Sequence, residues 1–416
     1  MMNFFNKKSQ ISIKDILSIL KNESTPLWIY HTETIINQIK KLKKFDIIRF
    51  AQKSCSNIHI LRIMKKMNVK IDAVSLGEIE RAIKAGYTSK NDDIVFTADM
   101  FTKETLKKIV KLNITVNAGS VDMLEQLGKI SPGHKVWIRI NPKFGHGHHF
   151  KTNTGGENSK HGIWDPKLTI PIIKKYELNC IGLHMHIGSG VNYEHLKNVC
   201  NAMKKQCIKF NQKIKAISAG GGLSIPYKKT DIPVNVNHYF HLWNNVREEI
   251  SKHFNNPIKL EIEPGRFLVG ESGILISQIC TIKKVGKKIF TLIDSGFNDL
   301  MRPVLYGSYH HISVIPKDNR NINTNKIIKT IIGGPLCESG DIFTQNENNQ
   351  LIEIELPEIK IGDYIVFHNT GAYGASMSSN YNSRPLISEV LITEKIPKII
   401  RRKQTIQELI RLETEI

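Results

Sequence analysis

The chain has 416 residues, of which 40% are hydrophobic and 23% charged, and its formal net charge is +21 at pH 7. Such a composition is typical of a globular protein, and the length allows two domains or one large barrel with an extension. No apolar run approaches the roughly 20 residues of a membrane span, and the first residues lack the layout of a signal peptide. We therefore expect a cytoplasmic protein without a membrane partner.

The basic excess does not by itself indicate a nucleic-acid partner. Lys and Arg are spread along the whole chain, often as Lys-Lys pairs on predicted helix faces, and Asn and Ile are also abundant. A general compositional drift explains this pattern more simply than a dedicated basic surface does. The sequence therefore predicts no nucleic-acid partner.

Cysteines and histidines do not form a metal or disulfide pattern. The six cysteines are scattered without Cys-x-x-Cys pairs, so zinc-site and disulfide-framework interpretations are both weak. The histidines at 146, 148, 149 and 161 lie in a glycine-rich loop without the spacing of metal ligands. No metal site is predicted.

Between about residues 46 and 266 the chain repeats a short apolar strand, a polar or glycine-rich turn and an amphipathic helix. Residues 78–84 and 105–110, for example, have apolar side chains at helical spacing. Eight such units predict an α/β domain of the (β/α)8 TIM-barrel type, with a doubly wound open sheet as the alternative. The predicted strands cover residues 50–53, 71–75, 94–97, 114–117, 136–141, 181–186, 216–219 and 260–263.

After about residue 270 the pattern changes to short β-rich runs such as 288–294, 327–332 and 351–356, separated by turns. This predicts a second, all-β domain resembling a β-sandwich or β-barrel, which we expect residues 1–29 to join. The predicted domains are thus 30–268 and 1–29 with 269–416, and a final amphipathic helix is predicted near 405–410.

Several residues that follow predicted barrel strands have side chains or backbone groups that could take part in catalysis or binding. In a barrel, such residues meet at one mouth. Lys53 follows the first strand and is either a surface lysine or an amine that forms a Schiff base with a carbonyl cofactor. The run 220–222 is three glycines after the seventh strand, and its backbone N–H groups can bind a phosphate. The alternative for the run is a flexible turn.

His186 and Glu263 follow the sixth and eighth strands. A histidine ring can stack on a pyridine ring, with Ser189 near a phosphate, although a satisfied core histidine and a metal ligand are the alternatives. A carboxylate beside a pyridine nitrogen keeps that nitrogen protonated and strengthens the ring as an electron sink. The Pro264-Gly265 turn would direct Arg266 at an anion.

The second domain has its own candidates. Arg302, close to Tyr306, can bind a carboxylate with two parallel hydrogen bonds. Cys337 can donate a proton to a carbanion, and Glu338 can pair with a substrate ammonium. Tyr373 can bond a cofactor phosphate. Together these residues indicate pyridoxal-phosphate chemistry on an amino acid.

From about residue 25 to 412 the chain resembles the diaminopimelate decarboxylases, pyridoxal-phosphate enzymes with an alanine-racemase-type barrel and a β domain, of the class that includes ornithine and arginine decarboxylases. The motifs that carry the resemblance are DAVSLGE (72–78), HMHIGS (184–189), GGGL (220–223), EPGR (263–266), DLMRP (299–303), CESGD (337–341) and GAYGASMSSNYNSRP (371–385).

The resemblance implies decarboxylation of meso-2,6-diaminopimelate to L-lysine and CO2, the last step of lysine biosynthesis, by a homodimer whose active sites are shared across the interface. Lys53 and Cys337 would be catalytic, with Lys53 forming a Schiff base with the cofactor and Cys337, from the other subunit, donating a proton. The cofactor would contact Lys53, His186, Ser189, Gly222, Glu263, Pro264, Gly265, Arg266 and Tyr373. The substrate would contact Arg266, Arg302, Tyr306, Glu338 and Tyr373.

Two segments depart from the commoner family pattern. His161 stands where an aromatic residue is usual, and residues 97–100 (TADM) replace a Gly-Asn type of turn. Neither change removes a catalytic group, but both leave the loop geometry open.

Two alternatives remain at this point. A decarboxylase of ornithine or arginine has the same fold, but those substrates lack a far carboxylate for Arg302. The other alternative is a cofactor-binding regulator without turnover. A non-catalytic relative would be expected to lose Lys53, Cys337 or Glu338, and all three are present.

Overall fold

The computed structural model describes residues 11–145, 154–186, 188, 190–318, 320–323, 325–394 and 396–415. The chain forms two compact units. The barrel unit comprises Gln38–Ile225 and Pro233–Leu268, and the β unit comprises Met1–Asn37, Pro226–Ile232 and Val269–Ile416.

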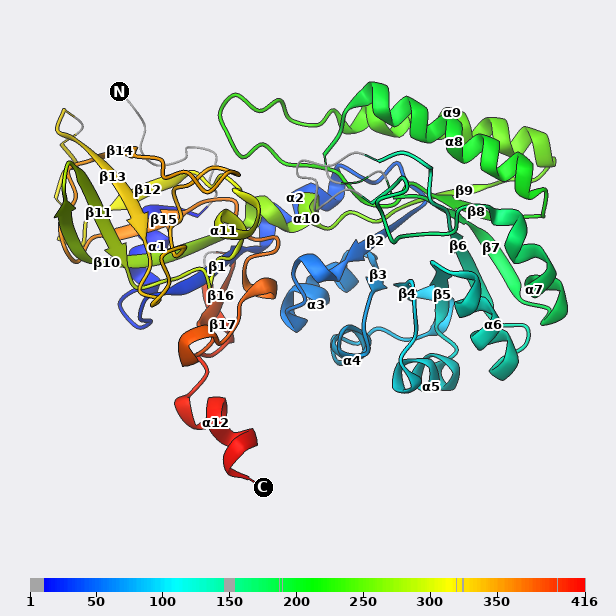
Figure 1. The fold of residues 1–416 in the computed structure, drawn as a ribbon, viewed down its shortest axis with the longest axis horizontal. Helices are drawn as coiled ribbons and strands as arrows, with labels where there is room; N and C mark the ends of the chain where they lie inside the picture. Colours follow the sequence, from blue (N-terminus) through cyan, green and yellow to red (C-terminus); the bar gives the residue numbers. More distant parts are fainter. Residues whose placement is uncertain are drawn as a thin grey trace. The chain divides into compact units, whose positions relative to one another are not determined.

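Eight parallel strands of the barrel unit form a closed barrel, in chain order from β2 to β9 (Figure 1). Pairing of Ile47 with Glu261 and of Ile48 with Ile262 joins the first strand to the last, which rules out the open doubly wound sheet. The strands are β2 (Ile47–Ala51), β3 (Lys70–Ala73), β4 (Ile94–Ala98), β5 (Thr115–Ala118), β6 (Lys135–Arg139), β7 (Asn179–His184), β8 (Ala216–Ser218) and β9 (Lys259–Ile262).

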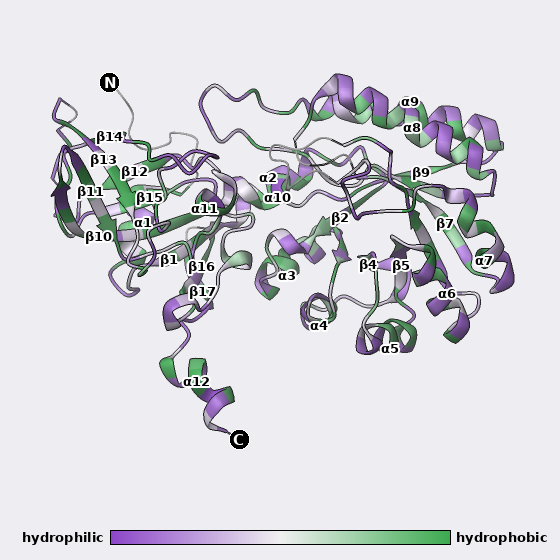
Figure 2. Cartoon of the chain, viewed as in Figure 1, coloured by the Kyte–Doolittle hydropathy of each residue, from purple (hydrophilic) through white to green (hydrophobic). Residues whose placement is uncertain are grey.

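Helices precede, connect and follow these strands, and they carry both hydrophobic and hydrophilic residues (Figure 2). A polar side chain caps the first turn of most of them; Ser75, for example, accepts a hydrogen bond from the N–H of Glu78 at the start of α4. The helices are α2 (Thr32–Lys40), α3 (Ile58–Lys66), α4 (Leu76–Lys84), α5 (Lys103–Leu112), α6 (Val121–Ile130), α7 (Ile170–Lys175), α8 (Tyr193–Phe210), α9 (Val236–Phe254) and α10 (Arg266–Val269).

The β unit contains one nine-stranded sheet. Its central path runs β14-β13-β11-β10-β1-β16-β17, while β15 pairs with both β10 and β12. The strands are β1 (Leu27–His31), β10 (Gly273–Val285), β11 (Lys288–Ile293), β12 (Ile312–Ile315), β13 (Ile327–Gly333), β14 (Ile354–Pro357), β15 (Tyr364–Phe367), β16 (Ser388–Thr393) and β17 (Ile396–Arg401). The expected fold class, a TIM-type barrel with a separate mostly β domain, is confirmed.

The first described segment belongs to this sheet, because β1 pairs antiparallel with β10 and parallel with β16. Helix α1 (Ile13–Ile19) supplies Ile16 to the apolar core, where it meets Leu27, Ile276 and Val366. Two further helices are α11 (Arg302–Tyr306) and α12 (Ile406–Thr414). The predicted C-terminal helix corresponds to α12.

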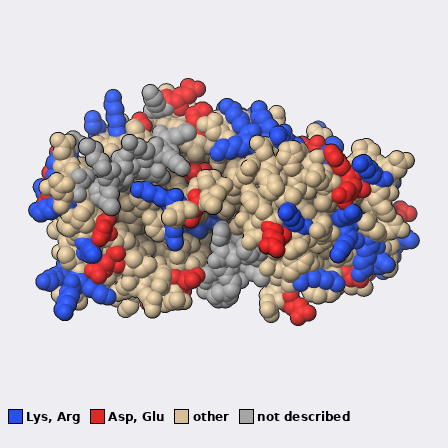
Figure 3. Space-filling view, turned by 90° about the horizontal axis from the view of Figure 1, so that it is seen from above, with Lys and Arg blue, Asp and Glu red and all other residues tan. Residues whose placement is uncertain are grey.

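Basic side chains are scattered over the face shown in Figure 3, and acidic side chains lie between them. Among the described residues, no helix is both long and apolar enough to cross a membrane. In the same residues, no group of three or more His, Cys, Asp or Glu side chains is arranged to hold a metal ion.

Candidate active site

Lys53 lies in a single 3-10 turn (Gln52–Ser54) directly after β2, at the carboxyl end of the barrel strand. The strand itself ends at Ala51, two residues earlier than predicted, and the Lys53 side chain is exposed. The turn is anchored by Ser54, whose Oγ donates to the Ala51 carbonyl at 2.9 Å. The amine is therefore accessible at the mouth of the barrel.

Two carboxyl groups lie near Lys53. Burial raises the pKa of Asp72 to about 6, and the charge of Glu263 adds to this shift, while Lys53 opposes it. Burial also raises the pKa of Glu78 to about 7, although the Val74 N–H bonds its Oε2 at 2.8 Å and Lys53 again acts in the opposite direction. Both groups therefore titrate close to neutral pH.

Glu263 follows β9 and is 7% exposed. Its Oε2 lies 2.7 Å from Nε2 of His184, the last residue of β7, and the Ser218 hydroxyl donates to its Oε1 at 3.4 Å. Burial alone would raise the pKa of Glu263, but the charge and hydrogen bond of His184 outweigh it and hold the pKa below its ordinary value. A buried carboxylate that stays ionised suits a protonated pyridine nitrogen.

His186 lies two residues beyond the end of β7 and is half-buried. Its Nδ1 accepts a hydrogen bond from the Gly221 N–H at 3.0 Å. Burial, followed by the positive charges of Lys53 and Arg139, lowers the pKa of His186 well below its ordinary value. The ring is therefore neutral, as stacking on a cofactor ring requires.

The glycine run follows β8, and two of its three N–H groups donate within the protein. Gly220 donates to Ser218 Oγ at 3.2 Å, and Gly221 donates to His186 Nδ1. Gly220 and Gly222 have φ values of +60° and +107°, which favour glycine. A Cβ on Gly220 would lie 2.3 Å from the Met185 carbonyl oxygen. The N–H groups of Gly220 and Gly221 are therefore engaged within the protein, and the contact of Gly222 with a phosphate stays a prediction.

The Glu263-to-Arg266 turn is held against the first strand of the barrel. The Pro264 carbonyl accepts a hydrogen bond from the Ala51 N–H at 3.2 Å. A Cβ on Gly265 would lie 3.1 Å from Ser54 Oγ. The close packing keeps this turn beside the Lys53 turn, and Arg266 begins α10.

Ser189, predicted near the phosphate, lies outside the described residues, as do the histidines at 146, 148 and 149.

The remaining predicted residues belong to the β unit. Arg302 begins α11 and is 5% exposed, and Tyr306 ends this helix. Cys337 and Glu338 are both exposed. Asn382 Oδ1 accepts a hydrogen bond from the Cys337 N–H at 2.9 Å, and the Tyr381 hydroxyl lies 3.3 Å from Glu338 Oε2.

Tyr373 adopts the left-handed conformation, with φ of +57°, which is uncommon for an aromatic residue. Its two flanking glycines pack tightly. A Cβ on Gly371 would lie 2.0 Å from the Val269 carbonyl oxygen, and one on Gly374 would lie 2.8 Å from the Trp28 ring. The conformation of this loop is therefore strongly determined by its surroundings.

Sequence reasoning missed several polar residues of the barrel mouth. The partner of Glu263 is His184, and the carboxyl groups near Lys53 are Asp72 and Glu78. These three residues stand in motifs of the sequence, but nothing in the sequence indicated their contacts. Contacts between side chains on different strands leave no local sequence pattern.

A second unforeseen pair joins the two departures from the family pattern. His161 Nδ1 lies 2.6 Å from Asp99 Oδ2, and the Gly162 N–H donates to Asp99 Oδ1 at 3.2 Å. The hydrogen bond of His161 and the charge of Arg139 hold the pKa of Asp99 below its ordinary value, although burial opposes them. The two unusual residues therefore contact each other.

The residues of the barrel mouth fit pyridoxal phosphate. An accessible lysine amine suits the aldehyde, a neutral imidazole suits the ring face, and the ionised Glu263 suits the ring nitrogen. Asp72 Oδ1 is buried and has no hydrogen-bond partner among the described residues, so it can accept a hydrogen bond from a bound group.

Comparisons with known proteins agree with this arrangement. Residues 32–270 match the family described as pyridoxal-dependent decarboxylase, pyridoxal binding domain. The matched region and the chemistry of the barrel mouth define the class, a pyridoxal-dependent decarboxylase.

Relatives that match over nearly the full length of the chain show which family within this class it belongs to. The chain is 61% identical over 414 residues to diaminopimelate decarboxylase of Buchnera aphidicola subsp. Schizaphis graminum (strain Sg), covering 99% of this chain and 100% of the relative. A crystal structure of diaminopimelate decarboxylase at 55% identity has a TM-score of 0.96, covering 99% of this chain and 98% of that one. The enzyme from Helicobacter pylori, complexed with L-lysine, is 30% identical with a TM-score of 0.83, covering 96% of this chain and 99% of that one. The chain belongs to the diaminopimelate decarboxylase family.

Proposed function

We propose that this protein decarboxylates meso-2,6-diaminopimelate to L-lysine and CO2 with pyridoxal phosphate as its cofactor, the last step of lysine biosynthesis by the diaminopimelate route. The observation that carries the proposal is the match over 99% of the chain and 100% of a diaminopimelate decarboxylase at 61% identity. Accessible Lys53 and ionised Glu263 at one barrel mouth support it.

In the proposed site, the barrel domain, residues 30–268, binds the cofactor. Bound pyridoxal phosphate supplies an electron sink for the pair released when CO2 leaves. Lys53 Nζ would hold the cofactor through its aldehyde and would give way to the amine of the substrate. His186 would lie against the ring face, and Glu263 would keep the ring nitrogen protonated. Ser189, Gly222, the Pro264-Gly265-Arg266 turn and Tyr373 bind the cofactor.

The β domain, residues 1–29 and 269–416, supplies most substrate contacts in this proposal. Arg302 binds the far carboxylate of diaminopimelate, and Glu338 pairs with the far ammonium. Tyr306 and Tyr373 complete the contacts, together with Arg266 of the barrel domain. Cys337 Sγ donates the proton that replaces CO2 on the former α-carbon. Ornithine and arginine have no far carboxylate, so Arg302 favours diaminopimelate.

We further propose a homodimer in which Cys337 and Glu338 of one subunit complete the site of the other. A catalytic thiol must reach the substrate, and Cys337 is exposed in the single chain. A cytoplasmic location fits a pathway enzyme that uses a soluble amino acid.

The direct test is to add meso-diaminopimelate to the purified, pyridoxal-phosphate-loaded protein and to measure lysine and CO2, with ornithine and arginine in parallel. Lysine from diaminopimelate alone is the expected result. CO2 from ornithine or arginine instead would overturn the role of Arg302 and Glu338. A loaded protein that converts none of the three would be a cofactor-binding regulator.

A further inference from the structure

The guanidinium of Arg302 is held by three uncharged acceptors within the β unit. Its Nη1 donates to the Tyr227 hydroxyl at 3.1 Å and to Nε2 of His310 at 3.0 Å, and its Nη2 donates to Ser308 Oγ at 3.2 Å. The guanidinium carbon also lies 5.0 Å from the centre of the Tyr227 ring. These contacts fix the plane of the guanidinium.

His310 has a hydrogen-bond partner at each ring nitrogen. A guanidinium can only donate, so Nε2 of His310 accepts and carries no hydrogen. Nδ1 lies 2.9 Å from the backbone carbonyl of His368, which can only accept, so Nδ1 carries the proton. The ring is 5% exposed and packs edge-on against Tyr227, with centroids 5.4 Å apart. The surroundings therefore select one neutral tautomer.

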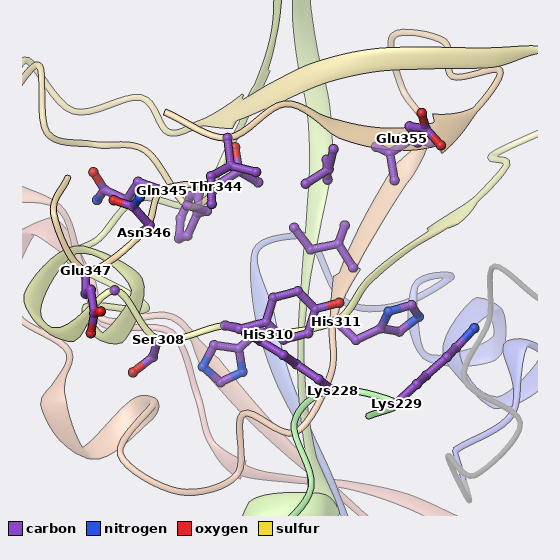
Figure 4. Close-up of a pocket in the computed structure, with 17 residues that line it drawn as sticks. Lys228, Lys229, Ser308, His310, His311, Thr344, Gln345, Asn346, Glu347 and Glu355 are labelled. Carbon is purple, nitrogen blue, oxygen red and sulfur yellow. The ribbon is translucent and has the colours of Figure 1, made fainter. Parts of the chain in front are cut away.

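His310 and Ser308 also line a cavity of about 680 Å³ in the β unit, shown in Figure 4. Apolar side chains such as Phe343 and Ile354 form part of its wall, and Lys228 and His311 belong to its polar lining. A small molecule that enters this cavity can therefore approach the position of the His310 ring.

We infer that His310 is a positioning residue, which aims the guanidinium of Arg302 at the far carboxylate of the substrate. The inference rests on the proposed function, because it assumes that Arg302 is the carboxylate clamp. Two parallel hydrogen bonds to a carboxylate require a defined guanidinium plane. The contact from Nη1 to His310 fixes that plane on one side, and the Nη2 contact to Ser308 fixes it on the other.

The test uses two substitutions that differ in the space they leave. His310→Ala removes the acceptor and opens a hole beside the cavity, whereas His310→Leu removes the acceptor and fills the space. Both are expected to raise the KM for meso-diaminopimelate about tenfold, with a smaller change in kcat, because binding of the far end is shared by ground and transition states. Added imidazole should restore the KM of His310→Ala but not that of His310→Leu.

His311→Ala is the matched control, because His311 lines the same cavity, and its ring neighbour is His368 rather than Arg302. Its KM should stay at the wild-type value, with or without imidazole. Melting temperature and cofactor absorbance, measured for every variant, report whether the protein is folded and loaded.

Calorimetry gives a readout that does not need turnover. L-lysine keeps the carboxylate that Arg302 would bind, whereas 1,5-diaminopentane has none. His310→Ala should weaken L-lysine binding about tenfold and leave the diamine unchanged. An unchanged KM in folded His310→Ala, or equal weakening of both ligands without rescue by imidazole, would overturn the inference. Failure of the wild-type protein to release CO2 would reject the proposed function itself, and the clamp with it.

Discussion

At the residue scale, the surroundings of Lys53 combine access with charge. The side chain is exposed, which the proposed exchange with an incoming amine requires, and Asp72 and Glu78 lie within reach of its charge. We expect these carboxyl groups to hold the ammonium in place whenever it is released from the cofactor.

The amine itself can be tested directly. Lys53→Ala should abolish both the absorbance of bound cofactor and decarboxylation, because no other group in the proposal forms the covalent link. Absorbance spectra and CO2 release measure the two effects. Retention of a Schiff-base absorbance band in this variant would assign the link to another lysine.

The thiol should behave differently. Cys337→Ala is expected to keep the cofactor absorbance and to lose at least about 100-fold in turnover, the usual size of a lost proton donor. Cys280→Ala is the control, because this thiol is also exposed. Full turnover without the Cys337 thiol would remove it from the mechanism.

The raised pKa of Glu78 predicts how the stability of the protein depends on pH. In the unfolded chain it ionises near its ordinary pKa of 4.5, but in the folded protein its pKa is raised to about 7. Between these values the folded state holds a proton that the unfolded state has released, so stability falls as pH rises from about 4.5 to 7. Glu78→Gln cannot ionise and keeps an acceptor for the Val74 N–H.

The melting temperature of cofactor-free Glu78→Gln should therefore rise relative to wild type as pH increases from 5 to 8. Because the charge of Asp72 contributes to the raised pKa of Glu78, the difference between the two curves includes the loss of that interaction. Exposed Glu413→Gln should follow the wild-type curve. Parallel curves for Glu78→Gln and wild type would show that Glu78 does not titrate in this range.

Single residues could be predicted where a motif carried them, and not where a partner from another strand defines them. Lys53, His186, Gly222 and Glu263 lie at the carboxyl ends of barrel strands, as predicted. The bond between His184 and Glu263 joins residues 79 positions apart. Neither residue has a local pattern that indicates the other.

At the scale of elements, the barrel helices end in a repeated way. Asn113, Asn211 and Asn255 follow α5, α8 and α9, each in the left-handed conformation. Apart from glycine, asparagine tolerates the left-handed conformation better than other residues do. The asparagine-rich composition therefore serves these helix ends.

Asn211→Ala should lower the stability of the protein by about 1 kcal/mol, because alanine disfavours the left-handed conformation. The φ of this residue is +48°. Asn211→Gly should be nearly neutral, since glycine adopts positive φ freely. Melting curves of the two variants provide the measurement, and an equal loss in both would point to the asparagine side chain rather than to the backbone.

All eight barrel strands could be predicted from the sequence, because each is a short apolar run beside an amphipathic helix. Strand ends moved by a few residues; β7, for example, ends at His184 instead of His186. The order of strands in the β unit could not be predicted. Its pairs join distant segments, such as Leu27 with Ser388, and hydrophobic alternation does not specify a partner strand.

At the scale of the whole molecule, the shared-site dimer makes a complementation prediction. Lys53→Ala and Cys337→Ala subunits should each be inactive as homodimers. If subunits exchange at random in an equal mixture, half of the dimers are mixed, and each mixed dimer contains one site with both native residues. The mixture should regain about a quarter of wild-type activity.

The rate of CO2 release, measured before and after subunit exchange, shows whether the active sites are shared between subunits. A mixture that stays inactive while native mass spectrometry shows mixed dimers would mean that each subunit uses its own Cys337. A protein that remains monomeric at working concentration would reject the dimer.

Asp99 and His161 belong to the two segments that depart from the commoner family pattern, and their side chains contact each other. Replacing His161 alone with the usual aromatic residue would leave a half-buried carboxylate without the bond at 2.6 Å, and restoring a Gly-Asn turn alone would remove the partner of the imidazole. Each single exchange therefore leaves one polar group of the pair without its partner, whereas the double exchange removes both groups together. The two positions are therefore epistatic, so a chimera with a relative should exchange both segments together.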